Sequence, residues 1–309
     1  MKNHYIYIST LIFILFLKIN SIMAQHGSIP EYAMGARAYA MGQSALLSFS
    51  DAVHVSMSPS SICDVQKLTA SIFYSKYNSN TTNSSYGIVY PTKNYGFLGI
   101  SFFHFTIEGI EKRDEQNVSA GKFSFNQNHL LFMYGRNITS KLSFGLNAKF
   151  VSQSMAEYKS FVKNIGMDLG VKFIPKFSNS IVKNFLFGVA IDNLIKPAIK
   201  LDKEQEYLPL EIGLILENKF IFSSSSITVV GNLVYFQRAF ESNNYTLHLG
   251  LEYSYKNMFL RIGYRDNYYS FGFGLKIYSL ILNYFYSESN YSQKYSTLNN
   301  GISISFEIK

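Results

Sequence analysis

From Leu68 onward, apolar and polar residues alternate with a period of two, the pattern of a β-strand with two unlike faces. In the clearest example, positions 142, 144, 146, 148 and 150 are apolar, whereas 143, 145, 147 and 149 are Ser, Gly, Asn and Lys. The pattern recurs at 245–255 and 302–308. It predicts about fourteen strands, at 68–78, 84–92, 95–107, 128–136, 141–153, 165–174, 185–192, 208–216, 225–236, 245–255, 258–265, 269–277, 279–288 and 300–308.

The connections between these strands alternate in length. The short ones are 93–94, 137–140, 256–257 and 277–278, and the long ones are 108–127, 154–164, 193–207, 237–244 and 289–299. Three connections depart from the alternation, at 175–184, 217–224 and 266–268. An even strand number with short turns at one end and long loops at the other is typical of a transmembrane barrel. A soluble β-sandwich shares the strand period, but it gives no reason for the alternation.

We therefore expect an all-β fold, a closed antiparallel transmembrane β-barrel of about 14 strands over residues 67–309. The segment 25–66 before it is unlike the rest. Between Glu31 and Asp64 it is rich in Ala and Gly, which lets one backbone approach another closely. Such a segment is suited to lie against a wall, and Pro59 ends any helix in it and starts a turn. The alternative is a surface amphipathic helix before an ordinary β domain.

Arg37 is a lone cation among these small residues, so it requires carboxylate or carbonyl partners. We expect it to anchor this segment to acidic residues that face the lumen, such as Glu252 or Glu211. His248 and Glu252 lie four residues apart on one face of a predicted strand, where they predict a lumen hydrogen-bond network.

The run Gly35-Ala36-Arg37-Ala38 with Met41-Gly42, then Asp51, then Ser58-Pro59-Ser60, resembles the N-terminal signature of the PorV/PorQ family. The sequence departs from that signature at Gln43, where the family has a second glycine, and at Ser58 and Ser60, where it has Asn and Ala. The resemblance implies a FadL-like outer-membrane barrel associated with type IX protein secretion. It also implies a hatch inside the barrel, with Gly35, Arg37, Gly42, Asp51 and Pro59 as its structural residues.

Composition supports a membrane barrel. Aromatic residues make up 17% of the chain and charged residues only 16%, against about 25% charged in soluble domains. Tryptophan is absent, so tyrosine must supply the aromatic girdles. The net charge is +8, but no basic run or helix suggests nucleic acid. We expect lysines at the barrel ends to face outer-membrane lipid phosphates or lipopolysaccharide. Cys63 is the single cysteine, which excludes an intramolecular disulfide and a cysteine-based metal site.

Residues 1–24 predict a signal peptide, with a short polar start, an apolar run from Tyr5 to Leu17, and Ala24 before the cleavage point. A single membrane anchor is the alternative for this segment. Export with no later apolar helix leaves the periplasm, the outer membrane or the exterior, and for a transmembrane barrel we expect the outer membrane.

The sequence predicts no catalytic residue, no cofactor and no metal. His54 and Ser56 suggest a nucleophile and base, but no strained elbow surrounds the serine and no third group is evident. Residues 108–115 (EGIEKRDE) are the densest charge run, interpreted as a solvated loop, or alternatively as a contact surface for a secreted partner.

Two functions fit these observations. The resemblance implies a non-catalytic component of type IX secretion, which would bind secreted cargo proteins or other secretion components. The alternative is a FadL-like channel for hydrophobic small molecules, in which the hatch moves and a strand kink opens a lateral path. The predicted lumen faces are mostly Ser, Gly, Asn, Lys and Glu, which weighs against an apolar channel.

Overall fold

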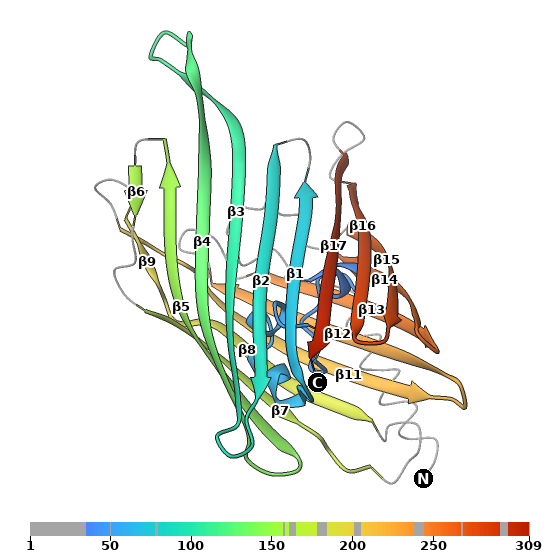
Figure 1. Cartoon of the computed structure of the whole chain (residues 1–309). Helices are drawn as coiled ribbons and strands as arrows, with labels where there is room; N and C mark the ends of the chain where they lie inside the picture. The colour runs from blue at the N-terminus through green and yellow to red at the C-terminus, as the bar shows by residue number, and fades with distance from the viewer. Residues whose placement is uncertain are drawn as a thin grey trace.

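The fold is a closed antiparallel barrel of fourteen strands, seen in a computed structural model of the chain (Figure 1). The structure describes residues 35–49, 51–77, 80–156, 158–160, 165–177, 184–200, 205–237, 244–266, 268–290 and 296–308. The predicted signal peptide, residues 1–24, lies outside them. The barrel strands are β1 (Leu68–Tyr77), β2 (Thr81–Pro91), β3 (Phe97–Arg113), β4 (Ser119–Asn137), β5 (Leu142–Met155), β7 (Gly166–Phe173), β8 (Phe185–Ile195), β11 (Leu210–Ile221), β12 (Ser225–Gln237), β13 (Asn244–Tyr255), β14 (Met258–Arg265), β15 (Tyr268–Ile277), β16 (Leu280–Asn290) and β17 (Ser296–Ile308).

The barrel closes because its first and last strands pair, with Leu68 opposite Ile308. Each predicted strand has a counterpart, so the predicted barrel is confirmed. Closure leaves no open sheet edge, which is what a sheet in lipid requires. Three short strands are additional: β6 (Tyr158–Ser160) extends the sheet beside β5, and β9 (Ala198–Ile199) pairs with β10 (Glu206–Tyr207).

The predicted long loop at 108–127 is wrong in part. Strand β3 continues to Arg113 and β4 begins at Ser119, so most of this segment is a hairpin that rises beyond the neighbouring strands (Figure 1). The apolar alternation stops there because no lipid or core faces these residues, but the backbone ladder continues past an irregularity between Ile107 and Ile110. Residues 81–83, predicted as part of a hairpin loop, are likewise strand, at the start of β2.

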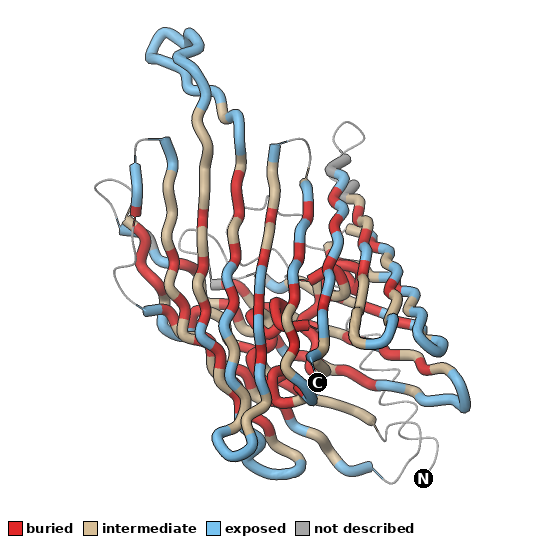
Figure 2. Tube along the Cα trace, in the orientation of Figure 1, coloured by how far each residue is buried: buried red, intermediate tan, exposed pale blue. Residues whose placement is uncertain are grey.

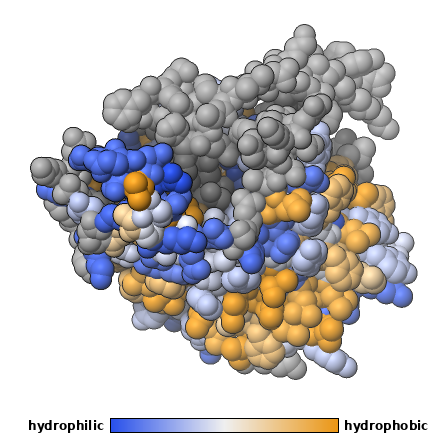
Figure 3. Space-filling view, turned by 90° about the horizontal axis from the view of Figure 1, so that it is seen from above, coloured by the Kyte–Doolittle hydropathy of each residue, from blue (hydrophilic) through white to orange (hydrophobic). Residues whose placement is uncertain are grey.

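The barrel strands place polar side chains inward and apolar side chains outward, which is the reverse of a soluble protein. On β5, Ser143 and Lys149 are only 4% and 5% exposed, whereas Phe144 between them is half-buried and faces outward. On β1, Phe73 is fully buried and Ile72 is 51% exposed. Outward apolar side chains gather on the flank of the barrel (Figure 3). We infer that this outer belt faces lipid.

Residues 35–49 and 51–65, which we refer to as the hatch, lie inside the barrel, where the buried positions concentrate (Figure 2). The hatch contains the helix α2 (Ala36–Ala40) and two 3₁₀ turns, η3 (His54–Ser56) and η4 (Pro59–Asp64). Helix α2 packs against β14 to β17, and η4 packs against β3, β4, β5 and β7. The hatch therefore crosses the lumen from one side to the other. None of the helices in the described ranges is long and apolar enough to span a membrane.

Candidate functional site

Arg37 joins helix α2 to the barrel wall through a buried ion pair. Its Nε donates to Glu252 Oε2 and its Nη2 to Glu252 Oε1, each at 2.8 Å. Arg261 of β14 also donates to Glu252 at 2.6 Å, and to Asn283 of β16 at 2.9 Å. Of the two carboxylates that the sequence suggested for Arg37, Glu252 is the one that accepts these bonds. Because both guanidiniums are buried, this carboxylate supplies counter-charge that water does not.

The hatch is attached to the barrel wall a second time at Gln43, just after the end of helix α2. Its carbonyl oxygen lies 2.9 Å from Nδ1 of His248, and its side-chain Oε1 accepts a hydrogen bond from Arg265. The other ring nitrogen of His248 contacts Thr246 Oγ1 at 3.0 Å. His248 and Glu252 thus both face the lumen, but each contacts a different part of the hatch. No pattern in the sequence predicts a role for Gln43, which stands out only as a departure from the family signature.

Gly35 and Gly42 lie where a side chain has no room. Gly35 has φ 98°, and a Cβ there would lie 2.8 Å from Asp51 Oδ2. Gly42 has φ 72°, and a Cβ there would lie 2.6 Å from the carbonyl oxygen of Leu249. Asp51 in turn accepts a hydrogen bond from the backbone N of His54 at 2.8 Å. Glycine at both places lets the hatch backbone turn and lie close against its neighbours.

Pro59 begins η4 at the opposite side of the lumen. A Cβ on Gly170 of β7 would lie 3.1 Å from Pro59 Cβ and 2.6 Å from Ser60 N, so the hatch backbone lies directly on the wall. At the end of the turn, Asp64 accepts from Lys172 Nζ at 2.5 Å. The predicted structural residues of the hatch therefore all lie at contacts, but at several separate ones.

Aromatic side chains line the wall that faces helix α2. The ring of Tyr39 stacks on Phe285 of β16, with centroids 4.3 Å apart and planes 9° apart, and its centroid lies 5.7 Å from that of Phe73 on β1. Phe103 and Phe105 of β3 belong to the same buried cluster. Tyr77, Ile107, Met57 and Phe125 pack against it and are partly buried. We call Phe73, Phe103, Phe105, Phe285 and these wall neighbours Tyr77, Ile107 and Phe125 the aromatic wall.

The buried side chains of the strands are mostly polar, as the sequence predicts, and the aromatic wall is an exception to this pattern. The run Phe102-Phe103-His104-Phe105 is apolar on both faces of the strand, so its inward members were indistinguishable from lipid-facing ones in the sequence. The structure separates them, because Phe102 is 39% exposed whereas Phe103 is fully buried. The aromatic wall continues from Phe73 to the Ile107–Phe125 pair, in the direction of the raised hairpin.

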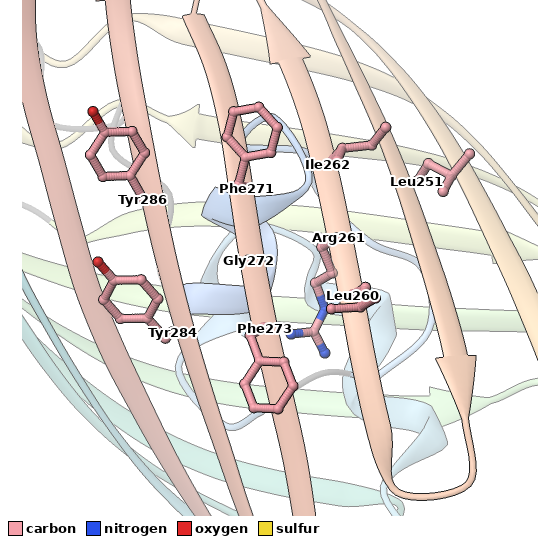
Figure 4. Close-up of a pocket in the computed structure, with 9 residues that line it drawn as sticks. All are labelled: Leu251, Leu260, Arg261, Ile262, Phe271, Gly272, Phe273, Tyr284 and Tyr286. Carbon is pink, nitrogen blue, oxygen red and sulfur yellow. The ribbon is translucent and has the colours of Figure 1, made fainter.

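The outer surface of the wall beside α2 shows at what height the hatch lies relative to the outer apolar belt. A groove of about 440 Å³ lies over Gly272, and its outward rim consists of apolar and tyrosine side chains such as Phe271, Phe273 and Tyr284 (Figure 4). On the inner side, a Cβ on Gly272 would collide with Ala40. The hatch therefore crosses the lumen at the level of the outer apolar belt.

The comparisons with known proteins identify the fold. No protein-family model matches the sequence, and no curated protein matches it. The toluene transporter TodX of Pseudomonas putida has a similar structure, with TM-score 0.64, 12% identity, and coverage of 89% of this chain and 98% of that chain. The chain therefore has the same barrel fold as this transporter.

Two further solved structures have a similar barrel fold. The toluene transporter TbuX of Ralstonia pickettii has TM-score 0.57, 11% identity, and coverage of 90% of this chain and 99% of that one. A FadL homologue of Pseudomonas aeruginosa has TM-score 0.61, 10% identity, and coverage of 90% and 99%. At these identities the likeness concerns the fold alone.

The candidate base and nucleophile, His54 and Ser56, both form hydrogen bonds within the hatch. His54 Nε2 accepts from the backbone N of Leu46 at 3.1 Å, and Ser56 Oγ donates to the carbonyl oxygen of Val53 at 2.8 Å. Burial lowers the pKa of His54 to about 3, and the charge of Arg37 adds to this effect. The ring is therefore neutral at physiological pH. Over the described ranges, no group of three or more His, Cys, Asp and Glu residues is arranged to hold a metal ion.

Proposed function

We propose that the protein is a channel for small hydrophobic molecules, which enter at the end of the raised hairpin, bind the aromatic wall and pass the hatch. The observation that carries this proposal is the aromatic wall itself. Apolar side chains inside a barrel gain stability only if something apolar covers them, at about 25 cal/mol per Å². The hatch covers the lower part of the wall, around Phe73 and Phe285. The partly buried upper part, around Ile107 and Phe125, is a surface on which a hydrophobic molecule can bind.

Helix α2 is the element that such a molecule must displace. Tyr39 closes the aromatic wall with a stacked ring, and a planar or aliphatic ligand can replace those contacts because they are not directional. Arg37, two residues earlier, stays bonded to Glu252 of β13, which lies three strands around the barrel from the β16 strand that carries Phe285. We therefore expect the ligand to move the aromatic side of the helix first.

The similar structures support this proposal. TodX and TbuX are toluene transporters, and CymD, with TM-score 0.60 and 12% identity, is a monoaromatic hydrocarbon channel. These proteins have the same fold, and the aromatic wall supplies the apolar lumen surface that a channel of this kind needs.

The test is uptake of labelled toluene and of a labelled long-chain fatty acid by cells that produce the protein in their outer membrane. Phe105→Ala removes an inward ring, and Phe102→Ala removes a lipid-facing ring from the same strand. Losing ~1.4 kcal/mol of ligand binding lowers uptake at low concentration about tenfold. We expect this loss for Phe105→Ala only. Equal uptake by both variants and the unchanged protein, or no uptake above cells without the protein, contradicts the proposal.

A PorV/PorQ-type role in type IX secretion is the second candidate, and the raised hairpin favours it. The hairpin carries exposed charges, including Arg113, which bonds Glu111 at 2.8 Å and Asn117 at 3.1 Å. An ordered charged hairpin is a suitable surface for a secreted protein. The test is recovery of exported cargo with the purified barrel, compared with a variant in which a two-residue turn replaces residues 109–121. Cargo recovered only by the intact hairpin supports secretion, and no recovery together with toluene uptake supports the channel.

A further inference from the structure

Two polar side chains lie within the aromatic wall, at one level of strands β1 and β2. Asn83 of β2 is opposite Ser75 of β1 on one side and opposite Phe105 of β3 on the other. Both polar residues are fully buried. They face the lumen, because Gly87 is on the same face of β2 as Asn83, and a Cβ on Gly87 would lie 3.1 Å from Cβ of Ala52 in the hatch. An amide and a hydroxyl group are thus enclosed by an otherwise apolar surface.

The hydrogen-bonding capacity of these two side chains is not used by the protein itself. Within the part of the chain that the structure describes, Oδ1 and Nδ2 of Asn83 and Oγ of Ser75 have no hydrogen-bond partner. Burying an amide among apolar groups is unfavourable unless it forms hydrogen bonds, and buried polar groups in folded proteins nearly always do so. A polar group that reaches this place in the lumen therefore gains two partners at once.

The hatch places a phenol ring beside this pair. The ring centroid of Tyr39 lies 5.7 Å from that of Phe73 and 6.2 Å from that of Tyr77. Ser75 is between these two residues on the same face of β1, so the ring of Tyr39 lies over the stretch of strand that carries Ser75. A free phenol has the same ring and the same hydroxyl group as this side chain, and it can occupy the same space once the helix moves.

We propose that small phenols are ligands of the aromatic wall, where they take the place of Tyr39 and bind their hydroxyl group between Asn83 and Ser75. The inference rests on the proposed channel and names the chemical class of its ligand. The hydroxyl group donates to Oδ1 of Asn83 and accepts from Oγ of Ser75, since amide and hydroxyl groups supply both donors and acceptors. The ring of the ligand packs on Phe105 and Tyr77.

Toluene is the matched comparison for phenol, because a methyl group replaces the hydroxyl group on the same ring. Both rings pack on the aromatic wall, but toluene leaves Asn83 and Ser75 without hydrogen bonds. A site with buried hydrogen-bonding groups discriminates against an analogue that leaves them unpaired. Phenol also loses more hydration than toluene when it leaves water, so the informative quantity is the ratio of the two affinities in one variant compared with another.

The test measures saturation binding of labelled phenol and labelled toluene to the full protein in nanodiscs, with empty nanodiscs as the blank. Asn83→Leu replaces the amide by an apolar side chain of similar size. The matched control is Asn300→Leu, because Asn300 is exposed and is opposite Lys76, on the outer face of the barrel. We expect the ratio of phenol affinity to toluene affinity to fall about tenfold in Asn83→Leu, equivalent to ~1.4 kcal/mol, and to stay unchanged in the control. Asn83→Ser, which keeps a hydroxyl group, should give an intermediate ratio.

The outcomes separate this inference from the proposed channel. Saturable toluene binding with an unchanged ratio in Asn83→Leu overturns the inference alone and assigns the buried amide to water. No saturable binding of either probe overturns the channel together with the inference. An equal fall of the ratio in Asn300→Leu shows a general change of the barrel and also counts against the inference. Ser75→Ala is a smaller change at the other hydrogen-bonding group, and it must lower the ratio in the same direction while the barrel stays folded by its heat-modifiable gel mobility.

Discussion

The two sides of the lumen differ in chemistry. On one side, β16, β1, β3 and β4 contribute the aromatic wall. On the other, strands β5, β7, β11, β13 and β14 contribute buried charges, such as Glu252 and Arg261, and the Lys149–Asp168 pair at 2.7 Å. Helix α2 joins both sides, because Tyr39 packs on the rings and Arg37 bonds Glu252.

This difference explains how one part of the hatch can be held in position while another part moves. Hydrogen-bonded ion pairs are directional, and a buried charge that loses its partner is strongly destabilising. Aromatic contacts depend mainly on apolar area, so a hydrophobic ligand can take the place of a ring. We infer that the charged side holds the position of the hatch and that the aromatic side responds to ligand.

The largest expected effect is at Glu252, on the charged side. Glu252→Gln removes the counter-charge between Arg37 and Arg261, and breaking a buried ion pair costs about 3–5 kcal/mol. We expect small hydrophilic solutes to leak through the barrel in liposome-swelling assays, while the barrel itself stays folded.

Arg37→Ala is the matched comparison for that variant. It leaves Glu252 paired with Arg261, so only the bonds of one guanidinium are lost, at about 1.5–3 kcal/mol. We expect leakage between that of the unchanged protein and that of Glu252→Gln. Unchanged leakage and thermal stability in both variants would show that this ion pair does not hold the hatch.

The next effect is on the aromatic side. Tyr39→Leu keeps most of the apolar volume but loses stacking on Phe285 and Phe73, an interaction of about 0.5–1.5 kcal/mol per ring pair. We expect toluene uptake to rise and hydrophilic leakage to stay near that of the unchanged protein. If both rise together, the two sides of the lumen do not act separately.

A pH effect tests the middle of the hatch. The pKa of His54 is lowered to about 3 by burial, so the neutral ring is favoured in the seated hatch. The free energy by which the neutral His54 ring stabilises the seated hatch is complete above a pH of about 6.5. It falls by about 1.4 kcal/mol for each pH unit below that. We expect leakage to rise from pH 7 to pH 5, with a smaller rise in His54→Gln. An identical pH profile for the variant contradicts this prediction.

The smallest effect is expected at Gln43. Gln43→Gly relieves a positive φ of 57°, which costs about 1 kcal/mol or more in a residue other than glycine, but loses the hydrogen bond from Arg265. The two changes oppose each other, so we expect a change in thermal stability equivalent to about 1 kcal/mol or less. Gln43→Ala loses the same hydrogen bond, but alanine still has to adopt the unfavourable positive φ. It should therefore be the less stable of the two variants. The reverse order would mean that the positive φ costs less than the backbone flexibility that glycine adds to the unfolded chain.

The alternation of residue types predicted the strands, their faces and the closed barrel, because lipid on one side and a filled lumen on the other impose a period of two. It placed Phe144 and Leu249 outward, as the structure does. It missed the continuation of β3 and β4 into the raised hairpin, where backbone pairing persists without any apolar face. It also missed the inward rings of β3, where both faces of the strand are apolar.

The sequence by itself determined that this chain forms a barrel with a small-residue segment before it, since period and composition are local properties. Only the tertiary structure decided which contacts the segment makes. Arg37 and Glu252 are 215 residues apart, and they meet because the strand order of the barrel brings β13 within reach of helix α2. Pairing over such a separation is set by strand register around the whole barrel, which no local pattern encodes.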